Sequence, residues 1–264
     1  MSNQKRQLKE LLENLKNNKD AVIIVGDRSD RNIFKIDDST KNEYSRKNMI
    51  KNPKEFWTFY SNSIYNQDMI KSISEKEKAI NKVLSSGCVK TVIDLTYTGN
   101  ITAPSNVNVI RLKGDVNKLR CMSCDKEYLV TQDLLNSYIE NGRVVKCSCN
   151  GKITPTMIMF GEKYKEKNIT ASKESVFINK DDKVELNTST LIFIDVDFEE
   201  DYIHEMMESY QAIQSSSNDN NFTVMICEKD GISIEYYKPD FATFEDVPDS
   251  IKRLLDNLNS YTEE

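Results

Sequence analysis

The stretch "RLKGDVNKLRCMSC", Arg111–Cys124, decides the fold because it joins two different kinds of structure. Its first residues complete the apolar run 107–112, which is typical of a buried strand. Its last four residues form a C-x-x-C pair, which is typical of a metal-binding knuckle. Lys113 and Gly114 stand between the two parts. The stretch therefore predicts a sheet domain that leads directly into a small metal-bound insertion.

The cysteines around this insertion predict a structural zinc ribbon. Cys121 and Cys124 form the C-x-x-C pair, Cys147 and Cys149 form a C-x-C pair, and 22 residues separate the pairs. Four thiolates leave no open coordination position, so the zinc would be structural. A module of about 30 residues buries too little core to fold alone, and metal ligation supplies on the order of 10 kcal/mol. The alternative is four ordinary buried thiols.

Apolar runs elsewhere predict a parallel α/β sheet. Strands are expected at 21–26, 89–95, 107–112, 155–160, 190–195 and 222–227. Helices are expected at 7–18, 52–66, 73–84 and 247–260, where apolar residues recur at helical spacing. Alternation of strands and helices favours an open, mostly parallel, Rossmann-like sheet.

Two sections break this alternation and predict a smaller domain. They are an aromatic helical section, 44–84, and the cysteine section, 119–152. We therefore expect one unit over 1–264, with a large domain formed by 1–43, 85–118 and 153–264 and a small domain formed by 44–84 and 119–152.

Composition narrows the classes of function. The chain has 264 residues, a net charge of -6 and no apolar run approaching the ~20 residues of a membrane span. Acidic charge gives no general reason to bind nucleic acid or an anionic membrane. The first ten residues lack the apolar segment of a signal peptide. We expect a soluble, intracellular protein, with the cytoplasm favoured over the nucleus.

The residues after the ribbon resemble the sirtuin family. "GKITPTMIMFGEKY", 151–164, is similar to the family's glycine, apolar-basic-Pro motif, apolar strand and Phe-Gly-Glu. "NPKEFWTFY", 52–60, and "NVIRLKGDVNKLRCMSC", 108–124, resemble its aromatic helix and its strand leading into the first knuckle. The resemblance implies a Rossmann-like domain, a zinc-ribbon domain, and NAD and an acyl-lysine peptide in the cleft between them. It also implies NAD-dependent protein deacylation or, in some members, ADP-ribose transfer.

The residues at the family's catalytic positions differ. Its catalytic histidine, a general base, falls on Lys113, and a lysine of ordinary pKa is protonated at neutral pH and cannot be a base. Its Gly-Ala-Gly phosphate loop falls on Gly26, Asp27 and Arg28, followed by Ser29. The second glycine, which lets backbone amides approach a pyrophosphate, is thus an arginine.

Three further family motifs are also replaced. The family's Asp-Phe-Arg falls on 33–35, its Gln-Asn-Ile-Asp on 95–98, and its Gly-Ser or Gly-Thr turn on 195–197. The resemblance thus implies zinc as a structural cofactor and leaves NAD doubtful.

The replacements place acids where strands of the predicted sheet end, at Asp27, Asp94, Asp195 and Asp197. Carboxyl ends of parallel strands share one edge, so these acids would repel a diphosphate by roughly 3 kcal/mol per charge pair at ~6 Å. Arg28, Lys35 and Lys113 are expected at the same edge, and we hypothesise that acids and bases pair with one another in place of a NAD site. The alternative is that each charge is a solvated loop residue.

Three functions follow. The first is an inactive pseudoenzyme of the sirtuin type, whose cleft binds a protein or peptide by strand addition, as a binding or regulatory module. The second is an active NAD-dependent deacylase or ADP-ribosyltransferase with non-standard catalytic residues. The third is a hydrolase whose aspartates bind Mg²⁺ or Mn²⁺. The single histidine, His204, is expected on a helix surface, and the sequence leaves enzymatic activity open.

Overall fold

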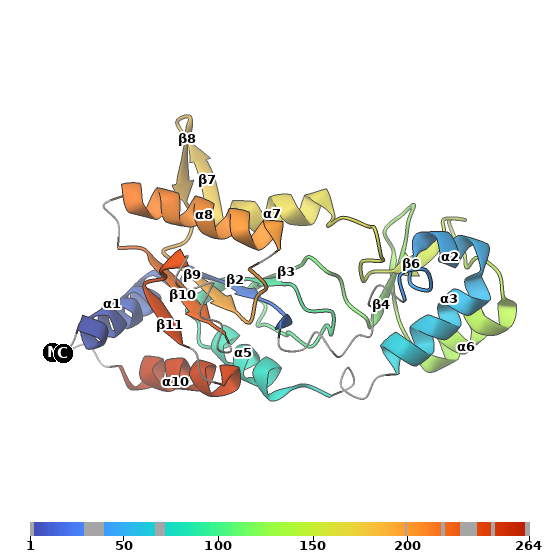
Figure 1. Ribbon diagram of the computed structural model, residues 1–264, viewed down its shortest axis with the longest axis horizontal. Helices are drawn as coiled ribbons and strands as arrows, with labels where there is room; N and C mark the ends of the chain where they lie inside the picture. The colour runs from blue at the N-terminus through green and yellow to red at the C-terminus, as the bar shows by residue number, and fades with distance from the viewer. Residues whose placement is uncertain are drawn as a thin grey trace.

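The computed structural model describes residues 3–28, 40–66, 72–198, 200–217, 220–227, 237–243 and 246–261. The chain forms a large lobe around a six-stranded sheet and a smaller lobe of helices and short strands (Figure 1). None of the described helices is both long and apolar enough to cross a lipid bilayer.

The large lobe contains the predicted parallel sheet, which is confirmed. Its strands run in the order β11-β10-β9-β1-β2-β3, and every neighbouring pair is parallel. The bounds are β1 Ala21–Val25, β2 Val89–Asp94, β3 Asn108–Arg111, β9 Thr190–Ile194, β10 Phe222–Ile226 and β11 Phe241–Thr243. All residues of β1, β9 and β10 are buried, as expected when helices cover both faces of a sheet.

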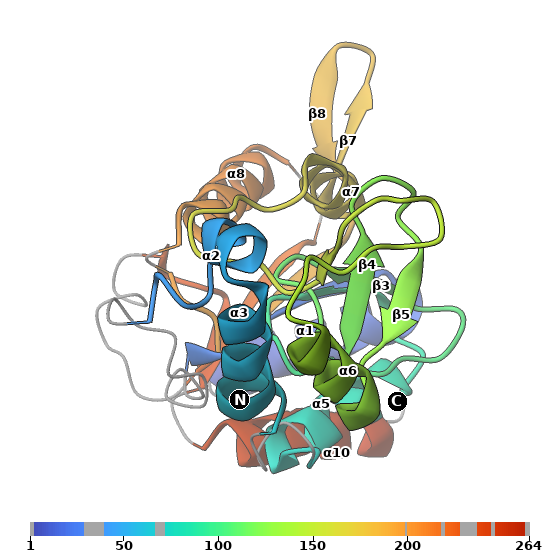
Figure 2. The ribbon, with the colours of Figure 1, turned by 90° about the vertical axis from the view of Figure 1, so that its right-hand side faces the viewer.

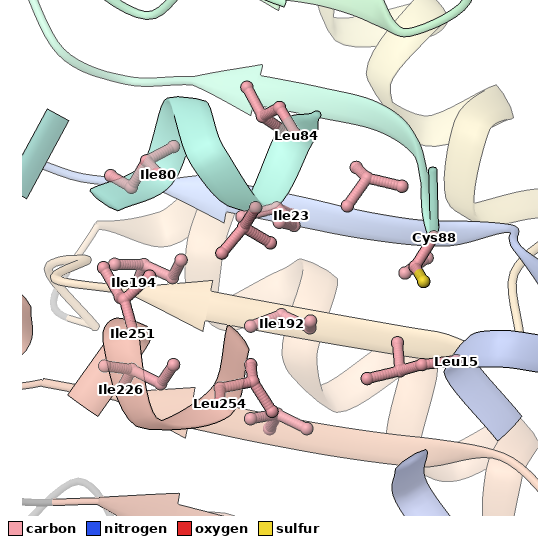
Figure 3. Packing of buried hydrophobic residues seen from close by; sticks show 14 of the residues in the cluster. Leu15, Ile23, Ile80, Leu84, Cys88, Ile192, Ile194, Ile226, Ile251 and Leu254 are labelled. Carbon is pink, nitrogen blue, oxygen red and sulfur yellow. The ribbon is translucent and has the colours of Figure 1, made fainter. Parts of the chain in front are cut away.

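Helices cover the two faces of this sheet. α1 (Asn3–Asn18), α5 (Glu75–Leu84) and α10 (Val247–Ser260) pack on one face through apolar side chains that include Leu15, Ile80 and Leu254 (Figure 3). α7 (Glu166–Val176) and α8 (Asp201–Ser216) pack on the other face. The apolar face of α5, including Val83 and Leu84, packs on the sheet.

The small lobe has a separate aromatic core. It contains α2 (Arg46–Lys51), α3 (Pro53–Phe59), which continues as a π-helix, η2 (Tyr60–Tyr65), and α6 (Gln132–Asn141). β4 (Lys118–Cys121) pairs antiparallel with β5 (Glu127–Leu129) and β6 (Ile153–Pro155). The buried Trp57 ring lies 5.1 Å from the ring of Tyr138 in α6, which ties the helical section to the cysteine section.

Two segments differ from the predicted elements. The strand expected over 155–160 is wrong, because only Ile153–Pro155 is a strand. The following backbone amides donate to scattered partners, including the carbonyls of Lys113 and Tyr44, and so form no ladder. β7 (Phe177–Lys180) and β8 (Lys183–Leu186) form a hairpin that projects from the large lobe (Figure 2).

Candidate functional site

A pocket of about 790 Å³ lies where the carboxyl ends of the sheet strands face the segment that follows the ribbon. Asp27 follows β1, Tyr97 follows β2, Lys113 follows β3 and Asp197 follows β9, and all four side chains line the pocket. The opposite wall is formed by the segment 158–164. We call this pocket the cleft.

Lys113 is held by two carboxylates inside the cleft. Its ammonium nitrogen lies 2.7 Å from a carboxylate oxygen of Glu200 and 3.3 Å from one of Asp27, and it lies 5.4 Å from the ring centre of Tyr97. Burial alone would lower the pKa of Lys113, but Asp27, Tyr97 and Glu200 together raise it above its ordinary value. Lys113 is therefore a fixed cation at neutral pH and has no free electron pair with which to accept a proton.

The two carboxylates differ in their surroundings. Burial raises the pKa of Asp27, although the neighbouring Lys113 partly offsets that effect. Glu200 also accepts a hydrogen bond of 2.8 Å from the Tyr164 hydroxyl. Burial and the charge of Glu200 raise the pKa of Tyr164, so the phenol stays protonated and remains a donor.

A second ion pair lies deeper, between β1 and β9. The Lys76 ammonium lies 2.6 Å from the carboxylate of Asp195, and only 5% and 1% of these residues are exposed. The same ammonium donates to the Gly26 carbonyl at 3.4 Å. Asp195 has φ +52°, a left-handed conformation that glycine adopts far more readily.

The described residues of the loop after β1, 26–28, lie against the end of β9 and the residue that follows it. A Cβ atom on Gly26 would lie 2.4 Å from the Asp195 carbonyl oxygen, so the two loops are in close contact. The Gly26 amide donates to Ile194 and the Arg28 amide donates to Asp195. In dinucleotide-binding folds such amides point at the pyrophosphate, whereas here they are used internally and face carboxylates. The amides of Gly26 and Arg28 are therefore not available to a diphosphate in this conformation.

A third ion pair involves the end of β2. Asp94 is fully buried, its carboxylate lies 3.4 Å from the Arg111 guanidinium, and it accepts hydrogen bonds from the Thr96 amide and hydroxyl. Burial raises the pKa of Asp94 to about 6, against the opposing effects of Thr96 and Arg111.

The structure thus brings together most of the residues singled out from the sequence. Asp27, Asp94 and Asp195 each pair with a different cation, of which only Lys113 was expected at this edge, and Asp197 lines the cleft. Ser29 and residues 33–35, which include Lys35, lie outside the described residues.

Three partners were not anticipated, namely Arg111 in β3, and Lys76 and Glu200 at the starts of helices. Lys76 lies in the first turn of α5 and Glu200 is the residue before α8. In the sequence each has the surroundings of an ordinary surface charge at a helix start, so only the tertiary structure identifies them.

The four cysteines of the ribbon lie together. Their Sγ atoms are all within 4.8 Å of one another, with Cys121 and Cys149 at 3.4 Å and Cys124 and Cys147 at 3.7 Å. Four sulfurs placed ~2.3 Å from a tetrahedral zinc ion would be about 3.8 Å apart, so the donor set fits Zn²⁺. Within the part of the chain that the structure describes, no other set of three or more potential ligands is close enough to share an ion.

Neighbouring groups favour the thiolate form of Cys147, which is the form that binds a metal. The Cys149 amide and the Tyr128 hydroxyl lower the pKa of Cys147 to about 5, and the hydroxyl lies 2.9 Å from its sulfur. A Cβ atom on Gly151 would lie 2.5 Å from the Cys121 sulfur, so this position requires glycine.

Comparison with known proteins identifies a family model and relatives that are similar in sequence. A family model described as "Sir2 family" matches residues 26–186. The NAD-dependent protein deacetylase of Sulfolobus acidocaldarius is 31% identical over 118 residues, which is 42% of this chain and 44% of that protein. The protein of the same name from Saccharolobus solfataricus is 34% identical over 124 residues, 44% of this chain and 46% of that protein. The chain is therefore aligned with less than half the length of these relatives.

Solved structures match over nearly the whole chain. One described as Sir2 bound to acetylated peptide has a TM-score of 0.70 and 18% identity, and covers 96% of this chain and 99% of that one. One described as a Sir2 homolog–NAD complex has a TM-score of 0.67 and 16% identity, and covers 95% and 93%. At these identities the likeness shows the fold alone.

Proposed function

The chain belongs to the Sir2 family, and we propose that it is a catalytically inactive member that binds a protein or peptide in its cleft. The fold and the cleft support the part of the proposal that concerns peptide binding. The replaced residues at the strand ends support a lost reaction.

The observation that carries the proposal is the state of Lys113. The family resemblance puts a general base at this position. Here the side chain is a cation bound to Glu200 and Asp27, and its pKa is raised. A general base must have a pKa near the working pH, and the neighbours of Lys113 shift it in the opposite direction.

The cofactor loop supports the same conclusion. Lys76 and Asp195 occupy the region between the ends of β1 and β9, and the loop amides of Gly26 and Arg28 already donate to the chain itself. A dinucleotide would have to break this buried pair and bring its own negative charge beside Asp27. We therefore propose that NAD does not bind and that zinc, held by Cys121, Cys124, Cys147 and Cys149, is the resident cofactor.

The charge of the cleft suggests which peptides it accepts. Five acidic residues line it, against two lysines. The acids are Asp27, Glu162, Asp197, Glu200 and Asp201, and the lysines are Lys113 and Lys163. A peptide with several positive charges is therefore the favoured occupant, by charge complementarity. Phe160, 36% exposed, offers an apolar surface beside these charges.

Calorimetric titration with NAD, followed by a nicotinamide-release assay, tests the proposal. The zinc-loaded protein should neither bind NAD nor release nicotinamide, with or without an acylated peptide. In the same buffer, a basic peptide should bind and an acidic peptide of equal length should not. The variant D201N, which removes one acidic charge from the cleft wall without changing the shape of the side chain, should weaken binding of the basic peptide.

The alternative function is an active NAD-dependent deacylase or ADP-ribosyltransferase with non-standard residues. The names of the relatives from Sulfolobus and Saccharolobus favour it. Release of nicotinamide by the wild-type chain, lost in K113M, would establish this alternative and overturn the inactive assignment.

A further inference from the structure

A second pocket, of about 350 Å³, lies between the two lobes. It shares Ile158, Glu162 and Lys163 with the cleft, but its other walls are β3, the start of α7, and β4 of the ribbon. None of the residues with which Lys113 pairs lines it, so an anion bound here would not contact the ion pairs of Lys113.

Positive charge dominates this pocket. Six cationic residues line it against three acidic ones. The cations are Arg111, Lys118, Arg120, Lys163, Lys165 and Lys167, and the acids are Asp115, Glu127 and Glu162.

Ion pairs compensate part of this excess, and Arg111 is taken up by the buried Asp94 at 3.4 Å. Lys118 lies 3.1 Å from Glu127, whereas Arg120 and Lys167 share the exposed Asp125 at 3.5 Å and 3.9 Å. Within the described residues, Lys165 has no carboxylate within ion-pair distance.

The lysines are placed where a protein chain normally avoids them. Lys165 is the N-cap of α7 and makes no side-chain capping hydrogen bond, and Lys167 lies in the first turn. The helix dipole makes this end positive, so cations here are unfavourable and anions favourable. Burial, then the charges of Arg120 and Lys167, lower the pKa of Lys165.

We propose that this pocket binds a phosphate-class oxyanion, which the cluster of Arg120, Lys163, Lys165 and Lys167 is built to hold. A phosphate group carries up to two negative charges and several acceptor oxygens. It would therefore compensate both the crowded ammonium groups and the uncapped helix start. The same chemistry is offered by a free phosphate compound and by a phosphorylated side chain.

Calorimetric titration with pyrophosphate, at constant ionic strength set with chloride, tests the proposal on the zinc-loaded full chain. We expect saturable binding that K165E weakens about tenfold or more, since it replaces an attractive charge by a repulsive one. K183E is the matched control, because it makes the same charge change on the projecting β7–β8 hairpin. Pyrophosphate affinity in K183E should stay within about twofold of wild type.

Two further measurements complete the test. A phosphoserine peptide and its unphosphorylated form identify the source of the phosphate group. Binding of the phosphopeptide that is tighter than that of pyrophosphate, and that K165E weakens, indicates a phosphorylated protein partner. Without any anion, K165M should raise the thermal midpoint, since it removes repulsion. No saturable pyrophosphate binding, or equal weakening by K165E and K183E, would overturn the proposal.

Discussion

Replacing Lys76 by methionine tests the buried ion pair between the ends of β1 and β9, on which the proposed loss of the cofactor site depends. The pair is 2.6 Å long and almost fully buried. At an effective dielectric near 20 its attraction is roughly 6 kcal/mol, but removing two charges from water costs several kcal/mol each, so the pair itself contributes little net stability. K76M keeps the stem volume and removes the ammonium partner of the Asp195 carboxylate. We expect it to lower the free energy of unfolding by about 3–5 kcal/mol.

A second substitution separates the effect of the ion pair from the effect of the backbone conformation at residue 195. D195G removes the carboxylate that Lys76 faces. It also relieves the left-handed backbone conformation, which costs an aspartate about 1 kcal/mol. The double variant K76M/D195G should therefore recover to within about 1–2 kcal/mol of wild type, with a coupling energy of at least ~2 kcal/mol between the two sites.

Urea denaturation at neutral pH, followed by circular dichroism, measures these energies for the wild type, both single variants and the double variant. The matched control is K78M, two residues further along α5, where the half-exposed Lys78 pairs with the exposed Glu75. K78M should change stability by less than ~0.5 kcal/mol. If K76M costs under ~1 kcal/mol, or if the two losses simply add in the double variant, the reasoning about the buried pair is refuted.

Three other predictions concern the strand end, the ribbon and the cleft. The pKa of Asp94 is raised to about 6, so its contribution to stability is present at low pH and is lost as the pH rises through about 6. Relative to D94N, the wild type should gain roughly 2–2.5 kcal/mol between about pH 7 and pH 4 in urea titrations, and a constant difference would contradict this. Chelation of zinc, or C121S, should unfold the small lobe and shift Trp57 fluorescence to longer wavelength, while circular dichroism still shows the helices of the large lobe. Unchanged emission would contradict the shared core of Trp57 and the ribbon. K113H should not create deacylase activity, because the buried loop pair remains, and measurable nicotinamide release by K113H would contradict that.

The sheet could be predicted from the sequence because its strands are continuous apolar runs. β1, β9 and β10 are buried on both faces, and only parallel strands between helices need such uniform composition. The segment 155–160 has the same composition for a different reason. Met157 and Met159 fill the small-lobe core from an irregular backbone, and composition alone does not distinguish this from a strand.

The candidate site was predictable only in part. The order of the parallel strands brings Asp27, Lys113 and Asp197 to one edge, and this follows from their positions after apolar runs. Which cation meets which acid does not follow, because Lys76 and Glu200 reach the edge from helices whose orientation depends on packing. The pocket of lysines beside the ribbon was hidden for a similar reason, since "KYKEK", 163–167, has the composition of any solvated helix start.

The strand order also has a consequence for folding during synthesis. β1 lies between β2 and β9 in the sheet, although about 165 residues separate β1 from β9 in the chain. After β2 emerges from the ribosome, one side of β1 has no partner until residue 194 has been made. At ~5–20 residues per second this interval lasts roughly 5–20 s. Throughout that time an apolar strand presents unpaired backbone groups, so the nascent chain is a candidate for chaperone binding. The ribbon is complete once Cys149 has been made, so it can bind its metal before the sheet has formed.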